Sequence, residues 1–349
     1  MAAQTPERLP FHHPRVRPEW LAKLTEEIID PTLPIIDPHH HLWKARPDPY
    51  LLADLAADLR TGHNVLATVF IQCRSEYRAS GPDEMQPVGE TEFVAAAARE
   101  SESGEYGALR ACAGIVGHAD CLLGERIDEV LQAHIQAGEG RFKGIRHSGT
   151  YDPGIAPTAL PGAPPGLYRD TAFRAGFGRL HAHGLTFEAW LYHPQLGDLV
   201  DLLRAFPDQK VVLNHLGGPL GVGPYENRRA EVFAQWRAYM TELAACPNLY
   251  VKLGGLAMNV NGFGFHHEVL PPSSGEMATA WRPYIETAVE LFGADRCMFE
   301  SNFPVDKGMC NYPVLWNAFK RVAAGCSADE KATLFHRSAQ RFYSLPNMA

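Results

Sequence analysis

Three adjacent histidines follow the first apolar run of the chain, in the segment IIDPHHHLW (35–43). His39 and His41 are separated by one residue, so in an extended backbone both imidazoles point to the same side as Asp37. Rings held in this way suit a shared metal ion or a shared anionic substrate. A lone buried histidine is usually a hydrogen-bonded core residue, but the position directly after a predicted strand favours a functional pair.

Another histidine closes a later apolar run, in VVLNHLGGP (211–219). His215 lies on the same face as His39 and His41 if the strands form a barrel. Three imidazoles and one water make a catalytic zinc geometry, in which the metal lowers the pKa of water to about 7. The sequence therefore predicts that His39, His41 and His215 bind a divalent metal, with zinc as the favoured ion. Metal-free action stays open, because three rings can also polarise a carbonyl through their N–H groups.

A carboxylate and an amide end the last apolar run, in RCMFESNFPVDK (296–307). Glu300 and Asn302 share parity, and Asp306 follows in the next loop. Hydrolysis needs an acceptor for a proton of the attacking water, and Glu300 is the inward carboxylate nearest the expected site. Glu300 and Asn302 are therefore predicted catalytic residues, although Glu300 as a buried structural acceptor explains the pattern equally well.

Three further charged residues on predicted strands are candidates for binding substrate. Arg146 ends FKGIR (142–146), where a guanidinium suits a substrate carboxylate. Glu188 is expected to point inward from a neighbouring strand, so an ion pair between the two is the competing interpretation. Lys252 lies in an apolar run and either binds an anion, neutralises Glu300, or extends its stem along the core.

The elements that must position these residues alternate along the chain. Eight short apolar or β-branched runs are each followed by an amphipathic stretch, which is the count of a (β/α)8 barrel. A doubly wound open sheet gives the same alternation. We predict one TIM-like barrel over residues 34–349, preceded by an arm at residues 1–33, with long substrate-covering loops at 151–170 and 258–276. The predicted strands are 33–37, 65–72, 109–116, 142–146, 185–192, 210–217, 248–255 and 296–302.

Composition argues against a nucleic-acid-binding, a disulfide-rich and a membrane-spanning protein. The 349 residues carry a formal net charge of -8 without a block of like charges, which argues against nucleic acid as a partner and favours a small-molecule substrate. The seven scattered cysteines predict neither a disulfide framework nor a zinc ribbon, and indicate a reducing cytoplasm. No apolar stretch is long enough for a membrane span. A homo-oligomer stays open, with the arm as one segment that could wrap a neighbouring subunit.

Five motifs, given in chain order at the end of this paragraph, resemble those of the amidohydrolase-related TIM-barrel family. The resemblance covers residues 33–345 and is strongest to the branch of 2-pyrone-4,6-dicarboxylate lactonase and sugar-acid lactonases. The resemblance implies a distorted (β/α)8 barrel that hydrolyses a C–O or C–N bond, most often the ester of a lactone. It also implies that His39, His41 and His215 bind a divalent metal or polarise the lactone carbonyl directly. The motifs are IIDPHHHLW, FKGIRHSG, YHPQLGDLVDLLRAFPDQKVVLNHLGGP, NLYVKLGGL and MFESNFPVDK.

The chain departs from the family pattern at the last strand. The family motif S-D-W-P, whose Asp activates water, aligns with Ser301 to Pro304, so Asn302 stands where the carboxylate is expected. An amide accepts no proton from water at neutral pH, which leaves Glu300 or a metal to activate it. Gly217 and Gly218 replace the arginine that follows the strand-six histidine in the pyrone lactonase, which argues against its dicarboxylate substrate.

The leading hypothesis is a lactonase-like hydrolase of a small carboxylated substrate. A metal-dependent decarboxylase or hydratase of the same family is the alternative within enzymes. A barrel that binds a small anion without turnover is the alternative outside them, because Asn302 removes an expected catalytic group.

Overall fold

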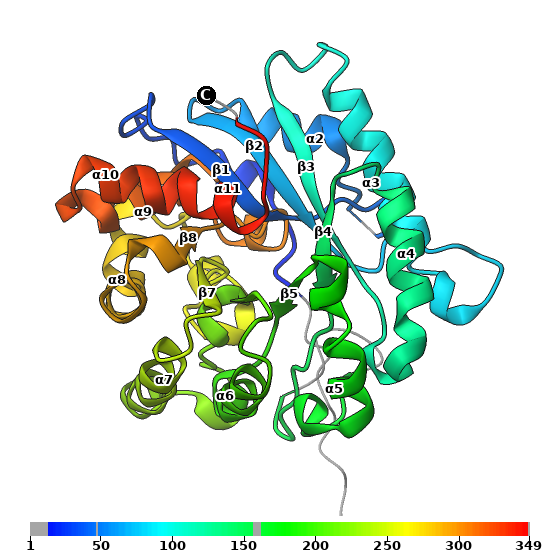
Figure 1. The fold of residues 1–349 in the computed structure, drawn as a ribbon. Coiled ribbons are helices and arrows are strands. Elements are labelled where there is room, and N and C mark those ends of the chain that lie inside the picture. Colours follow the sequence, from blue (N-terminus) through cyan, green and yellow to red (C-terminus); the bar gives the residue numbers. More distant parts are fainter. Residues whose placement is uncertain (1–12, 47, 156–161, 348–349) are drawn as a thin grey trace, which may run out of the picture.

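Eight parallel strands follow one another around a single sheet in chain order (Figure 1). The structure, a computed structural model, describes residues 13–46, 48–155 and 162–347. Each observed strand overlaps a predicted one, and the predicted (β/α)8 barrel is confirmed. The strands are β1 (Pro34–His40), β2 (Asn64–Ile71), β3 (Arg110–Gly117), β4 (Phe142–Arg146), β5 (Thr186–Ala189), β6 (Val211–Leu213), β7 (Leu249–Leu253) and β8 (Cys297–Phe299).

The ring closes between β1 and the segment that follows β8. The backbone N–H of Asn302 donates to the carbonyl of His39 at 2.9 Å, and the N–H of His41 donates to the carbonyl of Phe303 at 2.8 Å. Both bonds lie at the carboxyl end of the barrel, where barrel enzymes build their sites. Closure at this end therefore joins the histidine segment of β1 to the Glu300–Asn302 segment.

Helices surround the strands because each buries one apolar stripe against the outer face of the sheet (Figure 1). In α6 the buried side chains recur at helical spacing, at Leu196, Leu199, Val200 and Leu203. The main helices are α2 (Leu52–Leu59), α3 (Val88–Ser101), α4 (Ile127–Ala137), α5 (Thr171–Phe177), α6 (Leu196–Ala205), α7 (Arg229–Ala244), α8 (Ser274–Phe292), α9 (Tyr312–Val322), α10 (Ala328–Ala332) and α11 (Ser338–Phe342).

The C-terminal segment fills the end of the barrel interior opposite the histidines. Ser327 and Glu330 form a capping box at the start of α10, where each side chain bonds the backbone of the other residue. After α11, Tyr343 and Leu345 pack with Val69 and Met298, which point inward from the strands. This apolar layer is the base on which the buried polar groups described below are stacked.

The described part of the N-terminal arm, residues 13–33, packs against its own barrel. It contains one short helix, α1 (Pro18–Leu21), and the Trp20 indole donates to the carbonyl of Glu268 at 3.0 Å. Further along, Asn317 on α9 accepts a hydrogen bond from the Ile29 N–H at 2.9 Å. The arm thus lies across the loop that follows β7 and then along α9.

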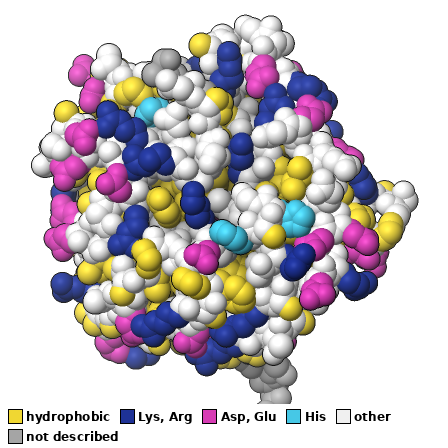
Figure 2. All heavy atoms as spheres, viewed as in Figure 1, with side chains coloured by type: hydrophobic (Ala, Val, Ile, Leu, Met, Phe, Trp, Pro, Cys, Tyr) yellow, Lys and Arg dark blue, Asp and Glu magenta, His cyan; other side chains and the backbone are white. Residues whose placement is uncertain are grey.

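The surface carries no large field of one charge on the face seen in Figure 2, where basic and acidic side chains are interspersed. Within the described residues, no helix combines the length and the apolar character that a membrane crossing requires.

Candidate active site

A cavity of about 700 Å³ lies at the carboxyl ends of the strands, where the predicted site residues converge. Its wall comes from the carboxyl end of β4, which carries Arg146, and from the segments that follow all eight strands. Rings and guanidinium groups dominate the wall, and Asp120 is its one carboxylate among the described residues. The lining residues are His13, His41, Arg46, Gln72, Cys73, Arg74, His118, Asp120, Leu122, Arg146, His147, Ser148, Thr150, Gly162, Ala163, Pro164, Trp190, His215, Met258, Asn302 and Val305.

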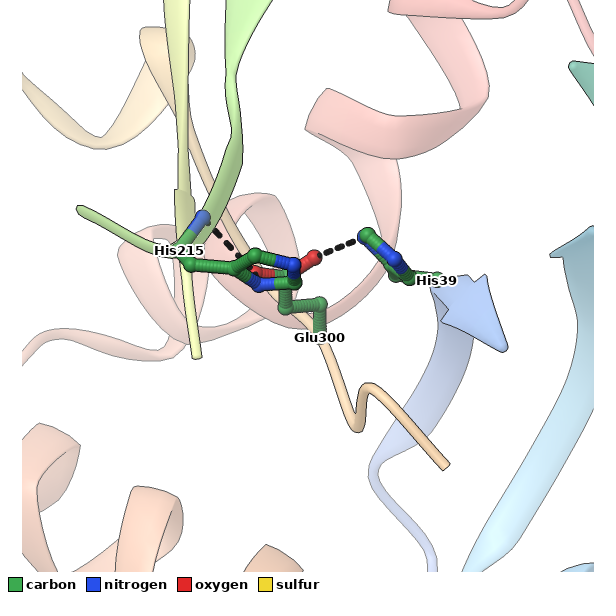
Figure 3. Close-up of side chains that lie close together, drawn as sticks. All are labelled: His39, His215 and Glu300. Carbon is green, nitrogen blue, oxygen red and sulfur yellow. Dashed lines mark hydrogen bonds and ion pairs between the residues drawn. The ribbon is translucent and has the colours of Figure 1, made fainter. Parts of the chain in front are cut away.

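A buried carboxylate lies between two imidazoles, as Figure 3 shows, and of these three residues only His215 lines the cavity. Glu300 Oε1 accepts from the His215 Nδ1–H at 2.7 Å and from the His215 backbone N–H at 3.1 Å. Its other oxygen, Oε2, lies 2.6 Å from Nδ1 of His39. Glu300 and His39 are fully buried, and His215 is 2% exposed. The structure therefore brings together three of the predicted catalytic residues.

The backbone leaves strand geometry at this point, which aims His215 into the site. His215 and Leu216 both have φ of 53°, a left-handed conformation that costs a non-glycine residue energy. Gly255, after β7, is required beside it, because a Cβ there would lie 2.2 Å from Nδ1 of His215. The strained turn and the glycine give the His215 ring its place against Glu300.

The carboxylate is only partly satisfied by hydrogen bonds. Glu300 Oε2 is buried and accepts no hydrogen bond from the described residues; the nitrogens close to it are Nδ1 of His39 at 2.6 Å and Nζ of Lys252 at 4.0 Å. One ligand atom each from His39, His215 and Glu300 lies within 4.8 Å of the other two. Two imidazoles and one carboxylate are a donor set that suits a divalent ion such as zinc, and a cation would satisfy the orphaned oxygen. The residues present therefore fit a metal site.

Burial keeps both imidazoles of this cluster neutral. The pKa of His39 lies well below its ordinary value, because the ring is buried and the Lys252 ammonium lies nearby. Burial also lowers the pKa of His215, with Glu300 opposing the shift. Neutral imidazole is the form that binds a metal or accepts a proton.

His41 lies beside this cluster rather than in it. Its ring centroid is 5.0 Å from that of His39, so the parity argument placed both rings correctly on one side. Its Nδ1 donates to the carbonyl of Ile71 at 2.7 Å, which fixes the tautomer and leaves Nε2 as the acceptor. The set of atoms close enough to share an ion contains Glu300 where the sequence predicted His41. The carboxylate takes that place because it bridges the two rings.

Arg146 reaches the cavity wall as predicted, 8% exposed. Its guanidinium lies 3.3 Å from Nε2 of His39 and 3.5 Å from the amide oxygen of Asn214, and it donates to the carbonyl of Gln72. No carboxylate of the described residues forms an ion pair with it, and its Nε–H has no acceptor. The predicted alternative, an ion pair with Glu188, is not formed.

Glu188 and Lys252 were expected to contact substrate, but the structure places them beneath the cavity. Both are fully buried and joined by an ion pair of 2.8 Å. Lys252 also donates to the carbonyl of Pro38 at 2.8 Å and lies 3.3 Å from Nδ1 of His39. Tyr343 donates to Glu188 from below. Glu188 is the register partner of Arg146, but its carboxylate contacts Lys252 and Tyr343, and neither Glu188 nor Lys252 lines the cavity.

Asn302 lines the cavity, with φ of 55° and 1% exposure. Its amide Nδ2 donates to Oδ1 of Asp306 at 2.7 Å. Asp306 is fully buried, and burial raises the pKa of its carboxyl well above the usual range. The expected strand-eight group is thus an amide that a second carboxylate holds.

Three histidines of the cavity wall were not predicted from the sequence: His13 in the arm, and two that follow strands. His118 directly follows β3 and His147 directly follows β4, and their rings lie 5.1 Å apart. The His118 Nδ1–H donates to the carbonyl of Arg146 at 3.0 Å, while Nδ1 of His147 accepts from the Cys121 N–H at 3.2 Å. Their place immediately after a strand was the signal available, as it was for His39.

The long loops contribute unequally to the cavity. Residues 162–164 of the loop after β4 line the wall, whereas residues 156–161 lie outside the described chain. From the loop after β7 only Met258 reaches this wall among the described residues. Later in that loop, Glu268 accepts the bond from Trp20 of the arm.

Comparisons with known proteins identify relatives of this chain and structures with a similar fold. The chain is 32% identical to the uncharacterised protein y4mH of Sinorhizobium fredii, over 88% of this chain and 98% of the relative. It is 25% identical to an L-fucono-1,5-lactonase of Burkholderia multivorans, over 90% of this chain and 97% of the relative. A crystal structure of a Burkholderia multivorans amidohydrolase with bound zinc superposes with a TM-score of 0.69 and 23% identity, over 89% of this chain and 99% of that one.

The amidohydrolase profile matches residues 36–345, which is nearly the whole barrel and includes every residue of the cluster at its base. The chain therefore belongs to the amidohydrolase family.

Proposed function

We propose that this protein is a hydrolase that opens the lactone ring of a small carboxylated substrate. One observation carries the proposal: a buried carboxylate, whose Oε2 has no hydrogen-bond donor among the described residues, lies between two imidazoles, and one of these, His215, lines an open cavity. Such an oxygen can bind a proton or a cation.

We assign substrate binding, charge stabilisation and proton transfer to different residues of the site. Arg146 binds the substrate carboxylate, because it is a cavity-lining guanidinium without an ion pair. His39, His41 and His215 face the lactone carbonyl and stabilise the charge that develops on its oxygen. Water adds to the carbonyl carbon, its proton passes to Oε2 of Glu300, and the ring C–O bond breaks. The proton then moves to the departing oxygen, so the product is a hydroxy acid.

The same atoms are suited to a divalent metal, with zinc as the favoured ion. When bound, the metal would supply Lewis-acid activation of the carbonyl and of the attacking water. His39, His215 and Glu300 would hold it, with His41 beside them. Without a metal, the imidazoles act on the carbonyl directly and Glu300 alone takes the proton.

Relatives support this proposal without deciding the substrate. Besides the L-fucono-1,5-lactonase, the chain is 23% identical to an L-rhamnono-gamma-lactonase of Scheffersomyces stipitis over 52% of its length. Zinc is bound in the structure of the Burkholderia amidohydrolase. The seven cysteines are all free thiols, which fits the proposed cytoplasmic location.

The test is titration of acid released from lactones at constant pH. L-Fucono-1,5-lactone, L-rhamnono-gamma-lactone and glucaro-1,4-lactone, which carries a carboxylate, form the first panel. We expect acid release well above the spontaneous rate, lost in His39→Ala and His215→Ala while the circular dichroism spectrum is unchanged. No acid release from any lactone, or carbon dioxide release from carboxylated substrates, would replace the proposal with binding alone or with decarboxylation.

The role of Arg146 has its own test. Arg146→Gln should raise KM about 10- to 100-fold for the carboxylated lactone, because a charge-assisted pair is lost. The same variant should change KM little for neutral lactones. An equal rise for both would mean that Arg146 shapes the cavity without binding the carboxylate.

A further inference from the structure

Asp306 is a buried carboxylate that the proposed reaction does not use. It is fully buried, and no lysine, arginine or histidine of the described residues forms an ion pair with it. Its Oδ2 accepts from the backbone N–H of Ala257 at 3.3 Å, and its Oδ1 accepts from the amide Nδ2 of Asn302 at 2.7 Å. Burying an unpaired carboxylate is costly, so a carboxylate kept in such a place needs an explanation.

The explanation lies in the two different ends of the Asn302 amide. The observed bond runs from the NH2 end of the amide to Asp306, so the amide oxygen is turned away from this carboxyl group. The Asn302 backbone is fixed independently, since its N–H donates to the carbonyl of His39 at 2.9 Å. The side chain lines the cavity, and no described residue donates to its Oδ1. The amide oxygen is therefore the atom left to face the cavity.

We propose that Asp306 is a positioning residue that holds Asn302 with its amide oxygen toward the cavity, where this oxygen accepts a hydrogen bond from the attacking water or from a substrate hydroxyl. The orienting contact rests on geometry alone, whereas its effect on turnover rests on the proposed function. In this arrangement the amide orients the nucleophile and Glu300, two residues earlier, takes the proton. One carboxylate could both orient the water and accept its proton; here Asn302 orients the water and Glu300 accepts the proton.

A swap of the two side chains tests the contact. Asn302→Asp alone places two carboxylates 2.7 Å apart in a buried site, so we expect a lower melting temperature and a loss of activity. Asp306→Asn alone frees the amide to rotate, and kcat should fall on the order of 10- to 100-fold with little change in KM. The double variant restores one amide–carboxylate bond with an oxygen toward the cavity, so both the melting temperature and kcat should recover to near the wild-type values. Asp208→Asn, the same change at an exposed loop residue, is the matched control and should behave as wild type.

The outcomes separate this inference from the proposed function. Recovery of the melting temperature without recovery of kcat would make the pair a structural contact and overturn the positioning role. A wild-type kcat in Asp306→Asn would overturn it as well. Neutron diffraction of the deuterated protein gives a readout that needs no substrate: deuterons on the amide atom facing Asp306 support the inference, and deuterons on the atom facing the cavity contradict it. This last result holds whether or not the protein hydrolyses lactones.

Discussion

Two clusters of buried polar groups are stacked in the barrel and differ in how completely their atoms are bonded. In the lower cluster, Lys252 pairs with Glu188, donates to the carbonyl of Pro38 and lies 3.3 Å from Nδ1 of His39, and both oxygens of Glu188 accept hydrogen bonds. In the upper cluster, Glu300 Oε2 has no donor, and the Nε–H of Arg146 nearby has no acceptor. Saturated polar groups in a core stabilise and specify the fold, whereas unsaturated ones are available to a ligand. The comparison predicts that the upper cluster determines activity and the lower one determines stability.

The strongest test of this division is Glu300→Gln. The amide keeps the size of the side chain but accepts no proton, so activity should fall about 10²- to 10⁴-fold. The melting temperature should change little, because the amide oxygen can still accept from His215. Initial rates of acid release and thermal melts measure the two effects. A Glu300→Gln variant that unfolds would place Glu300 with the structural cluster.

Lys252→Met should give the opposite pattern. Removing the ammonium leaves Glu188 buried without a cation, which costs about 3–5 kcal/mol of the free energy of unfolding. The double variant Lys252→Met/Glu188→Gln should recover most of this loss, because the uncompensated charge is gone. Denaturant titrations followed by fluorescence would show the difference. A stable single variant that has lost activity would instead assign Lys252 to the reaction.

Glu90 on α3 is another buried carboxylate with one bonded and one unbonded oxygen. Its Oε1 accepts from the N–H groups of Cys73 and Ser75 at 2.9 and 2.8 Å, which fixes the loop that carries Arg74 to the cavity, while its Oε2 has no partner. Burial raises the pKa of Glu90 from 4.5 to about 7.

The raised pKa of Glu90 makes the stability of the fold depend on pH, because proton binding and folding are thermodynamically linked. The folded state holds the Glu90 proton more tightly than the unfolded state, so this stabilisation is present below pH 4.5 and is lost as the pH rises to about 7. Relative to Glu90→Gln, the wild type should lose up to about 3 kcal/mol of stability over this range. Melting temperatures of both proteins from pH 4 to 8 test this, and parallel curves would mean that Glu90 titrates normally.

The smallest expected effect belongs to Tyr343→Phe. This change removes the donor to Glu188 Oε1 and should lower the free energy of unfolding by about 1–3 kcal/mol. Activity at a temperature where the variant is folded should be unchanged, because Tyr343 lies a layer below the cavity. A large loss of kcat without a change in stability would contradict the separation of the two clusters.

The periodicity of apolar residues predicted the fold, because the side-chain spacing of strands and helices is a property of neighbouring residues in the chain. Eight apolar runs become eight strands, and the alternation of side chains put His39 and His41 on one side. The positions of His215 and Asn302 do not follow from strand parity, since both residues have positive φ after their strands have ended. Their convergence required closure of the ring, which only the three-dimensional structure supplies.

The sequence could not show whether an inward-pointing charged side chain reaches the cavity or is buried beneath it. Glu188 and Lys252 occupy inward positions like that of Arg146, but their partners include Tyr343, far away in the chain and delivered by the segment after α11. Asp306 was noticed as a carboxylate in the last loop, whereas its bond to Asn302 depends on the turn between them. Long-range pairing therefore decided which charges reach the cavity.

Metal content tests whether the upper cluster binds a cation. Protein purified without chelators or an affinity tag would be measured by inductively coupled plasma mass spectrometry, beside Glu300→Gln and the structural control Tyr343→Phe. We expect close to one divalent ion per chain in the wild type and in Tyr343→Phe, and a marked loss in Glu300→Gln. The same metal content in all three proteins, whether one ion or none, would contradict the assignment of a cation to this cluster.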